Sequence, residues 1–130
     1  MEVLSQKPLI ILDGGHNEGC LRALCSMAEK YLAGKKTTLL MSFMKDKDYA
    51  SALSIIAPIS ENIVFTVTDT IRGEKPEMLA ATAEKYGKNI YCETSTAEAF
   101  KKALSLTDKD GVLIVTGSFY LVSDVRNMLS

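Results

Sequence analysis

Apolar residues in this chain gather in five short runs that are rich in β-branched side chains. The runs cover residues 8–12, 37–43, 63–67, 89–92 and 112–115. Each has the length of a strand, and a continuous apolar run of this kind is typical of a strand buried on both faces. The pattern therefore predicts five buried strands.

Helical periodicity fills the segments between these runs. Apolar side chains recur at helical spacing in the first segment: Leu21, Leu24, Cys25, Ala28, Tyr31 and Leu32. Shorter patterns predict helices over 49–56, 76–86, 97–106 and 119–129. Pro76 and Glu77 suit a first helical turn, Gly87 suits a left-handed end, and the hydroxyls of 94–96 suit a cap.

The alternation of strand and helix predicts the fold class. Parallel strands need crossover helices, so we expect a three-layer α/β sandwich with a mainly parallel, Rossmann-like sheet. Residues 1–130 are long enough for one such domain. Ligands of such folds bind at the carboxyl ends of the strands, where function is to be sought.

Charge and cysteine content narrow the classes of partner. Fifteen lysines and arginines against 16 acids leave no field that would attract nucleic acid or an anionic membrane. No run is long enough to span a membrane, and no signal peptide is evident. The three cysteines lack metal-site spacing, so a reduced chain in the cytoplasm is expected.

The richest candidate site follows the first apolar run, in the segment Asp13-Gly14-Gly15-His16-Asn17. Two glycines permit a tight turn and close approach of a ligand, and the following helix start favours an anion. Asp13 could accept hydrogen bonds from ribose hydroxyls, while His16, the one histidine, could donate to a phosphate. The alternative is an ordinary strand-to-helix turn with Asn17 as the helix cap, and neither GxGxxG nor a GxxxxGK[ST] loop is present.

Four stretches of the chain, taken in order, carry a family resemblance: 12–17 (LDGGHN), 46–48 (DKD), 72–77 (RGEKPE) and 116–126 (TGSFYLVSDVR). They resemble motifs of the folylpolyglutamate synthase and dihydrofolate synthase family of the Mur ligase superfamily, the first being similar to DGAHNP. Gly15 and Glu18 depart from the family's usual alanine and proline. The start of the chain resembles the family's segment at the boundary before its C-terminal domain, so we expect the N-terminal ATP-binding domain to be missing from this chain.

The resemblance implies an ATP-dependent ligase that adds glutamate to folates through an acyl phosphate, with dihydrofolate synthesis as a further option. It implies ATP contacts for Asp13, Gly14, Gly15, Asn17 and Arg72, with Asp13 on the ribose. It places His16 near the reacting phosphate as the catalytic residue. Magnesium would be held by the N-terminal domain, with no metal ligand in this chain.

The glutamate-binding residues implied by the resemblance are Ser118 and Tyr120, and each has a structural alternative. Ser118 could instead cap the last helix, and Tyr120 could be a core residue. Arg72 could satisfy carbonyls of its own loop, and residues 46–48 could be a solvated loop with a helix cap.

Three hypotheses of function stay open from the sequence. The first is the C-terminal domain of a folate ligase, working with its own N-terminal domain as a monomeric enzyme and inactive in isolation. The second is the C-terminal domain of a cell-wall Mur ligase. The third is a stand-alone nucleotide- or metabolite-binding module without catalysis.

Overall fold

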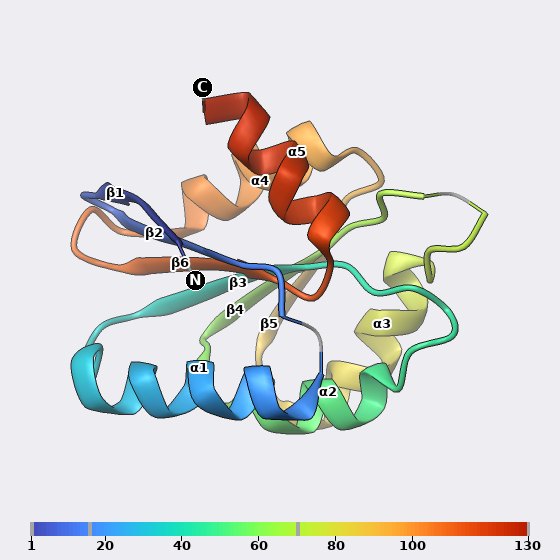
Figure 1. The fold of residues 1–130 in the computed structure, drawn as a ribbon, viewed down its shortest axis with the longest axis horizontal. Helices are drawn as coiled ribbons and strands as arrows, with labels where there is room; N and C mark the ends of the chain where they lie inside the picture. The colour runs from blue at the N-terminus through green and yellow to red at the C-terminus, as the bar shows by residue number, and fades with distance from the viewer. Residues whose placement is uncertain (1, 16, 70, 130) are drawn as a thin grey trace.

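A computed structural model of the chain describes residues 2–15, 17–69 and 71–129 and shows a three-layer α/β sandwich (Figure 1). Its six-stranded sheet has the order β1-β2-β6-β3-β4-β5. The strands are β1 (Glu2–Gln6), β2 (Leu9–Asp13), β3 (Thr37–Met41), β4 (Asn62–Phe65), β5 (Asn89–Cys92) and β6 (Val112–Thr116). All neighbours pair in parallel except β1 with β2. The predicted fold class is confirmed.

Helices cover both faces of the sheet. The described helices are α1 (Glu18–Tyr31), α2 (Tyr49–Ile56), α3 (Pro76–Ala83), α4 (Thr96–Leu106) and α5 (Phe119–Leu129), with 3-10 turns η1 (Ala57–Ile59) and η2 (Glu84–Tyr86). Helices α1 to α3 lie on one face, and α4 and α5 lie on the other (Figure 1). The predicted ends are confirmed: Ser95 caps α4, and Gly87 ends η2 with a φ of 70°.

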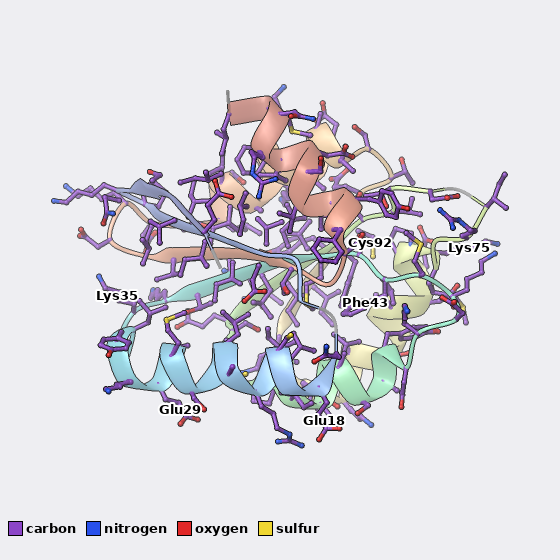
Figure 2. All side chains as sticks on the ribbon, viewed as in Figure 1. Glu18, Glu29, Lys35, Phe43, Lys75 and Cys92 are labelled. Atoms are coloured by element: carbon purple, nitrogen blue, oxygen red, sulfur yellow. The ribbon has the colours of Figure 1, made fainter. Side chains whose placement is uncertain are left out.

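Alternate residues of each central strand supply the two halves of the core. On β3, Leu39 and Met41 pack with α1 to α3, whereas Leu40 packs with α4 and α5. All three side chains are fully buried, as the period of two in a strand requires when both faces are covered. Figure 2 shows apolar side chains filling both spaces between sheet and helices. This burial holds the strand ends, and the loops that follow them, in fixed positions.

Strand β1 was not predicted, because its mixed sequence has no apolar run. It lies at the sheet edge, where Val3 remains 46% exposed, and it pairs antiparallel with β2 from Glu2 opposite Leu12 onward. Glu2 also forms a 2.6 Å ion pair with Arg126 of α5. The strand therefore covers one edge of the sheet and ties the start of the described chain to the last helix.

Within the described ranges, no helix combines the length and the apolar character that a membrane crossing requires.

Candidate functional site

The carboxyl ends of the three adjacent strands β2, β6 and β3 lie in register. Asp13 pairs with Thr116, and Thr116 pairs with Met41 on its other side. The loops that follow these strands therefore leave the sheet side by side. We call this rim, with the loop after β4, the carboxyl edge, and it carries every predicted site residue that the structure describes.

The turn after β2 is held closed by two hydrogen bonds. The Gly15 amide donates to Asp13 Oδ1 at 2.9 Å, and Thr116 Oγ1 donates to the Gly15 carbonyl at 3.2 Å. The first bond fixes the carboxylate over its own turn, and the second fastens the turn to β6. The Asp13 side chain thus lies at the strand tip, half-buried, with one oxygen engaged by the turn.

Both glycines of the turn are sites of close packing. A Cβ at position 14 would lie 2.6 Å from the Phe119 ring, and one at position 15 would lie 2.5 Å from Cys20 Cβ. Such distances are far below ordinary contact, so the turn has no room for side chains in its present path. Because neither glycine has a side chain, a ligand could approach the backbone of this turn closely.

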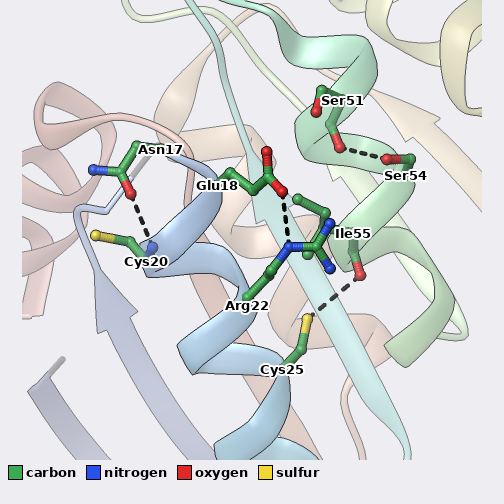
Figure 3. Close-up of polar contacts among 8 residues, drawn as sticks. All are labelled: Asn17, Glu18, Cys20, Arg22, Cys25, Ser51, Ser54 and Ile55. Atoms are coloured by element: carbon green, nitrogen blue, oxygen red, sulfur yellow. Dashed lines mark hydrogen bonds and ion pairs between the residues drawn. The ribbon is translucent and has the colours of Figure 1, made fainter.

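Asn17 caps α1, as its structural alternative predicted. Its side-chain oxygen accepts from the Cys20 amide at 2.9 Å (Figure 3). Glu18 is paired with Arg22 at 2.9 Å, and both side chains are exposed. The cap does not exclude a ligand contact, because the Asn17 side-chain NH₂ remains a donor. His16 lies outside the described residues, so its predicted role stays a prediction.

Ser118 and Tyr120 take different positions at the start of α5. Ser118 is buried and its Oγ accepts from the amides of Tyr120 and Leu121 at 3.1 and 3.5 Å, which confirms the alternative of a helix cap. Tyr120 is 56% exposed, so the alternative of a core residue is wrong. Its ring is available to a ligand or to a neighbouring side chain.

That neighbour is Arg72, from the loop after β4. Its guanidinium carbon lies 5.9 Å from the centre of the Tyr120 ring, and its Nε donates to Asp69 Oδ2 at 3.0 Å. Arg72 therefore binds a carboxylate rather than the carbonyls that the alternative had offered. The Arg72 amide, the guanidinium and then the Ile71 amide lower the pKa of Asp69 to about 2. Asp69, followed by Tyr120, raises the pKa of Arg72, so the pair is charged at neutral pH.

Arg72 also meets the loop after β3, where the DKD stretch lies. A surface pocket there is lined by Met44, Lys45, Asp46, Lys47 and Arg72. Asp48 caps α2 by accepting from the Ser51 amide at 3.1 Å, which confirms the predicted cap. The sequence did not reveal that the two loops share a pocket with three cations, because their residues are separated by a strand and a helix.

Three hydroxyls near the same edge are buried and have no hydrogen-bond partner among the described residues: Ser42, Thr66 and Thr68. Ser42 and Thr66 directly follow β3 and β4. They were not singled out from the sequence, because Ser42 and Thr66 lie inside the apolar runs 37–43 and 63–67; a hydroxyl residue within such a run is the signal that could have found them. In the same described ranges, no three His, Cys, Asp or Glu side chains gather as a metal site would require.

A mainly parallel sheet with helices on both faces, and with a glycine turn, a helix start and cations at its carboxyl edge, defines a doubly wound α/β domain, a class whose ligands bind at that edge. Comparison with protein families identifies the family to which this domain belongs. Residues 1–119 match the family model described as the Mur ligase, glutamate ligase domain, and the chain belongs to this family.

Curated relatives and solved structures agree with this assignment. The chain is 33% identical over 131 residues to the folylpolyglutamate synthase of Lacticaseibacillus casei, a match covering 99% of this chain and 29% of that protein. It is 26% identical over 129 residues to the dihydrofolate synthase/folylpolyglutamate synthase of Bacillus subtilis, covering 99% and 30%. The crystal structure of the bifunctional enzyme of Yersinia pestis, complexed with AMPPNP and manganese, superposes with a TM-score of 0.84 at 25% identity, over 98% of this chain and 30% of that one. This chain thus spans less than a third of each of these proteins.

Proposed function

We propose that this chain is the C-terminal domain of an ATP-dependent ligase that adds glutamate to folates. The observation that carries the proposal is the coincidence of family membership with a glycine turn at the carboxyl edge, bounded by Asp13 and the capped start of α1. The names of the relatives in Lacticaseibacillus casei and Bacillus subtilis supply the folate substrate. The Yersinia pestis complex with AMPPNP and manganese supports ATP and a divalent metal as the cofactors.

In this proposal, the reaction has two steps. The terminal carboxylate of the folate attacks the γ-phosphate of ATP, giving an acyl phosphate and ADP. The amine of glutamate then attacks the acyl carbon, and inorganic phosphate leaves as the amide forms. Negative charge develops on phosphate and carbonyl oxygens in both steps, so positioned N–H donors and cations accelerate them.

The nucleotide would lie along the turn after β2. Asp13 would accept hydrogen bonds from the ribose, since its carboxylate already stands fixed at the strand tip. The Gly14 amide and the side chain of Asn17 would face the phosphate chain at the positive end of α1, and Gly15, whose amide is engaged by Asp13, would contribute its lack of a side chain. His16 would act near the γ-phosphate or the acyl phosphate, and Arg72 would supply positive charge from the neighbouring loop.

The glutamate would bind near the start of α5. Ser118 Oγ already accepts hydrogen bonds from two backbone amides, so the hydroxyl would contact a glutamate carboxylate by donating its hydrogen. Tyr120 presents its ring and hydroxyl beside Arg72. The folate pocket, the phosphate-binding loop and the magnesium ligands would belong to an N-terminal domain that closes over this edge, in a monomeric enzyme.

The test uses the full-length protein. Release of ADP should require ATP, a reduced folate and glutamate together, and Asp13→Asn should lower kcat/KM for ATP by about a hundredfold, the order lost when a positioning contact fails. Asp110→Asn, at the opposite end of the sheet, is the matched control and should match the parent. ADP release that depends on a cell-wall nucleotide precursor in place of folate would instead favour the other branch of the superfamily.

The isolated 130-residue chain is expected to bind ATP weakly and to show no turnover, because most phosphate-holding groups would lie in the other domain. Calorimetry with ATP measures this directly, and micromolar affinity would contradict it.

A further inference from the structure

Arg72 is held at the carboxyl edge by contacts from three segments, and the first of these fixes its backbone. The Lys45 amide donates to the Arg72 carbonyl at 2.8 Å, and the Glu74 amide donates to the Phe43 carbonyl at 2.8 Å. Met44 and Gly73 form the bridge between these bonds. The backbone of the loop after β4 is thus fastened to the loop after β3 on both sides of Gly73, beginning at the Arg72 carbonyl.

Asp69 fixes the side chain as well as the loop. Its Oδ1 accepts from the amides of Ile71 and Arg72 at 2.9 and 3.0 Å, and its Oδ2 accepts from Arg72 Nε at 3.0 Å. The ion pair engages Nε, so the two terminal amino groups of the guanidinium are not consumed by it. Those groups are the ones that bind a phosphate or carboxylate in a bidentate manner.

Tyr120 contacts the guanidinium from a third segment. The Arg72 guanidinium carbon lies 5.9 Å from the ring centre, within the range of a cation–π contact. Arg72 is 65% exposed at its side chain, and an arginine with that exposure and no partners would sample many rotamers. Here Asp69 accepts from Nε, and the Tyr120 ring lies within cation–π distance of the guanidinium carbon.

We propose that Asp69 and Tyr120 are positioning residues that hold Arg72 in one orientation toward the anionic part of the nucleotide. This inference rests on the proposed function for the identity of the ligand. Neither residue needs to touch the nucleotide. Tyr120 accordingly has a structural task on the edge in addition to the glutamate contact proposed for it.

The experiment is a double-mutant cycle in the full-length enzyme, with Asp69→Asn, Arg72→Ala and the pair. Asn keeps an oxygen for the loop amides but removes the charge that binds Nε. We expect Asp69→Asn to raise KM for ATP about tenfold with a smaller change in kcat, and to cause no further loss when Arg72 is already alanine. Glu98→Gln, which removes an exposed carboxylate paired with Lys101 on α4, is the matched control and should leave both parameters at the parent values.

Two further measurements separate positioning from a role in folding. Tyr120→Leu removes both the ring and the hydroxyl beside Arg72 and should raise KM for ATP about fivefold, whereas Tyr120→Phe keeps the ring and should raise it less. Free guanidinium ion should partly restore Arg72→Ala, because Asp69 and Tyr120 still shape its place, and should not restore the double variant. A purely structural role would instead give losses in kcat/KM that multiply in the cycle, whether or not the thermal midpoint falls.

The outcomes distinguish this inference from the proposed function. Suppose that the parent enzyme releases ADP as expected. The positioning role is then refuted if Asp69→Asn has the same KM for ATP as the parent, or if its loss of activity multiplies with that of Arg72→Ala. If the parent shows no turnover with any folate, the proposed function fails. ATP affinity measured by calorimetry on the same variants then decides the positioning role, which an unchanged affinity in Asp69→Asn would refute.

Discussion

Replacing Gly15 by alanine should destabilise the fold, although the family that this chain resembles usually carries alanine there. A Cβ at this position would lie 2.5 Å from Cys20 Cβ and 3.0 Å from Asp13 Oδ1, where ordinary contact begins at 3.4 Å. The Cys20 Cβ belongs to the first turn of α1 and cannot rotate away, so the turn or the helix must shift by about 1 Å. Overpacking of this kind costs about 1–3 kcal/mol.

The measurement is urea-induced unfolding of the 130-residue chain, with the free energy of unfolding obtained by linear extrapolation. Gly19→Ala is the control: its Cβ would meet nothing closer than Asn17 Oδ1 at 3.5 Å, and alanine in a helix gains up to about 1 kcal/mol over glycine. Cys20→Gly removes the opposing carbon, so the double variant with Gly15→Ala should lose less than the two single losses added together.

The reasoning would be refuted by a Gly15→Ala protein whose free energy of unfolding lies within about 0.5 kcal/mol of the parent, the usual range for neutral surface changes. Additive losses in the double variant would show that the Cys20 Cβ is not the atom that the new methyl group meets.

Three further predictions concern the same edge and its supports. Asn17→Ala should lower the free energy of unfolding by about 1 kcal/mol through loss of the α1 cap, whereas Asn17→Ser should lose much less; urea unfolding of both checks this. Burial, followed by the charge of Glu29, raises the pKa of Cys25, and its Sγ donates to the Ile55 carbonyl at 3.4 Å (Figure 3). At pH 8, iodoacetamide should therefore modify Cys25 more slowly than the exposed Cys20. Equal rates of modification in the folded protein would contradict this. Because the pKa of Asp69 is lowered to about 2, its stabilising effect should be complete above about pH 4 and fade as the pH falls toward 2. The difference in the free energy of unfolding between the parent and Asp69→Asn should therefore shrink across this range. A difference that stays constant would refute the prediction.

The elements that the sequence predicted best are those whose burial pattern is strongest. The bounds of α2 and α5 were predicted as observed, and four of the five predicted strands differ from the structure by one or two residues at their ends, with 89–92 matching. Strand β1 escaped prediction because an edge strand half-exposed to solvent needs no apolar run. Its pairing depends on β2, which local sequence does not specify.

The features of the candidate site also fall into two groups, those that the local sequence indicated and those that depend on the tertiary fold. The turn of Asp13 and Gly15, the Asn17 cap and the Ser118 cap depend on neighbours within a few residues, so the local sequence was sufficient to indicate them. The contact of Arg72 with Tyr120 joins residues 48 positions apart, and the pocket it shares with Lys47 depends on the order of strands. Such pairs become visible only when the sheet topology is known.

The antiparallel course of β1 has a practical consequence for labelling and immobilisation. Because Glu2 pairs opposite Leu12, the start of the strand points toward the same rim as the glycine turn, so any tag or fusion partner joined ahead of it would crowd that rim. Helix α5 begins at the rim and leads the backbone away from it over 11 residues, a rise of about 16 Å. A surface-coupled protein should therefore be anchored through the end of α5, which leaves the rim open to small molecules in solution.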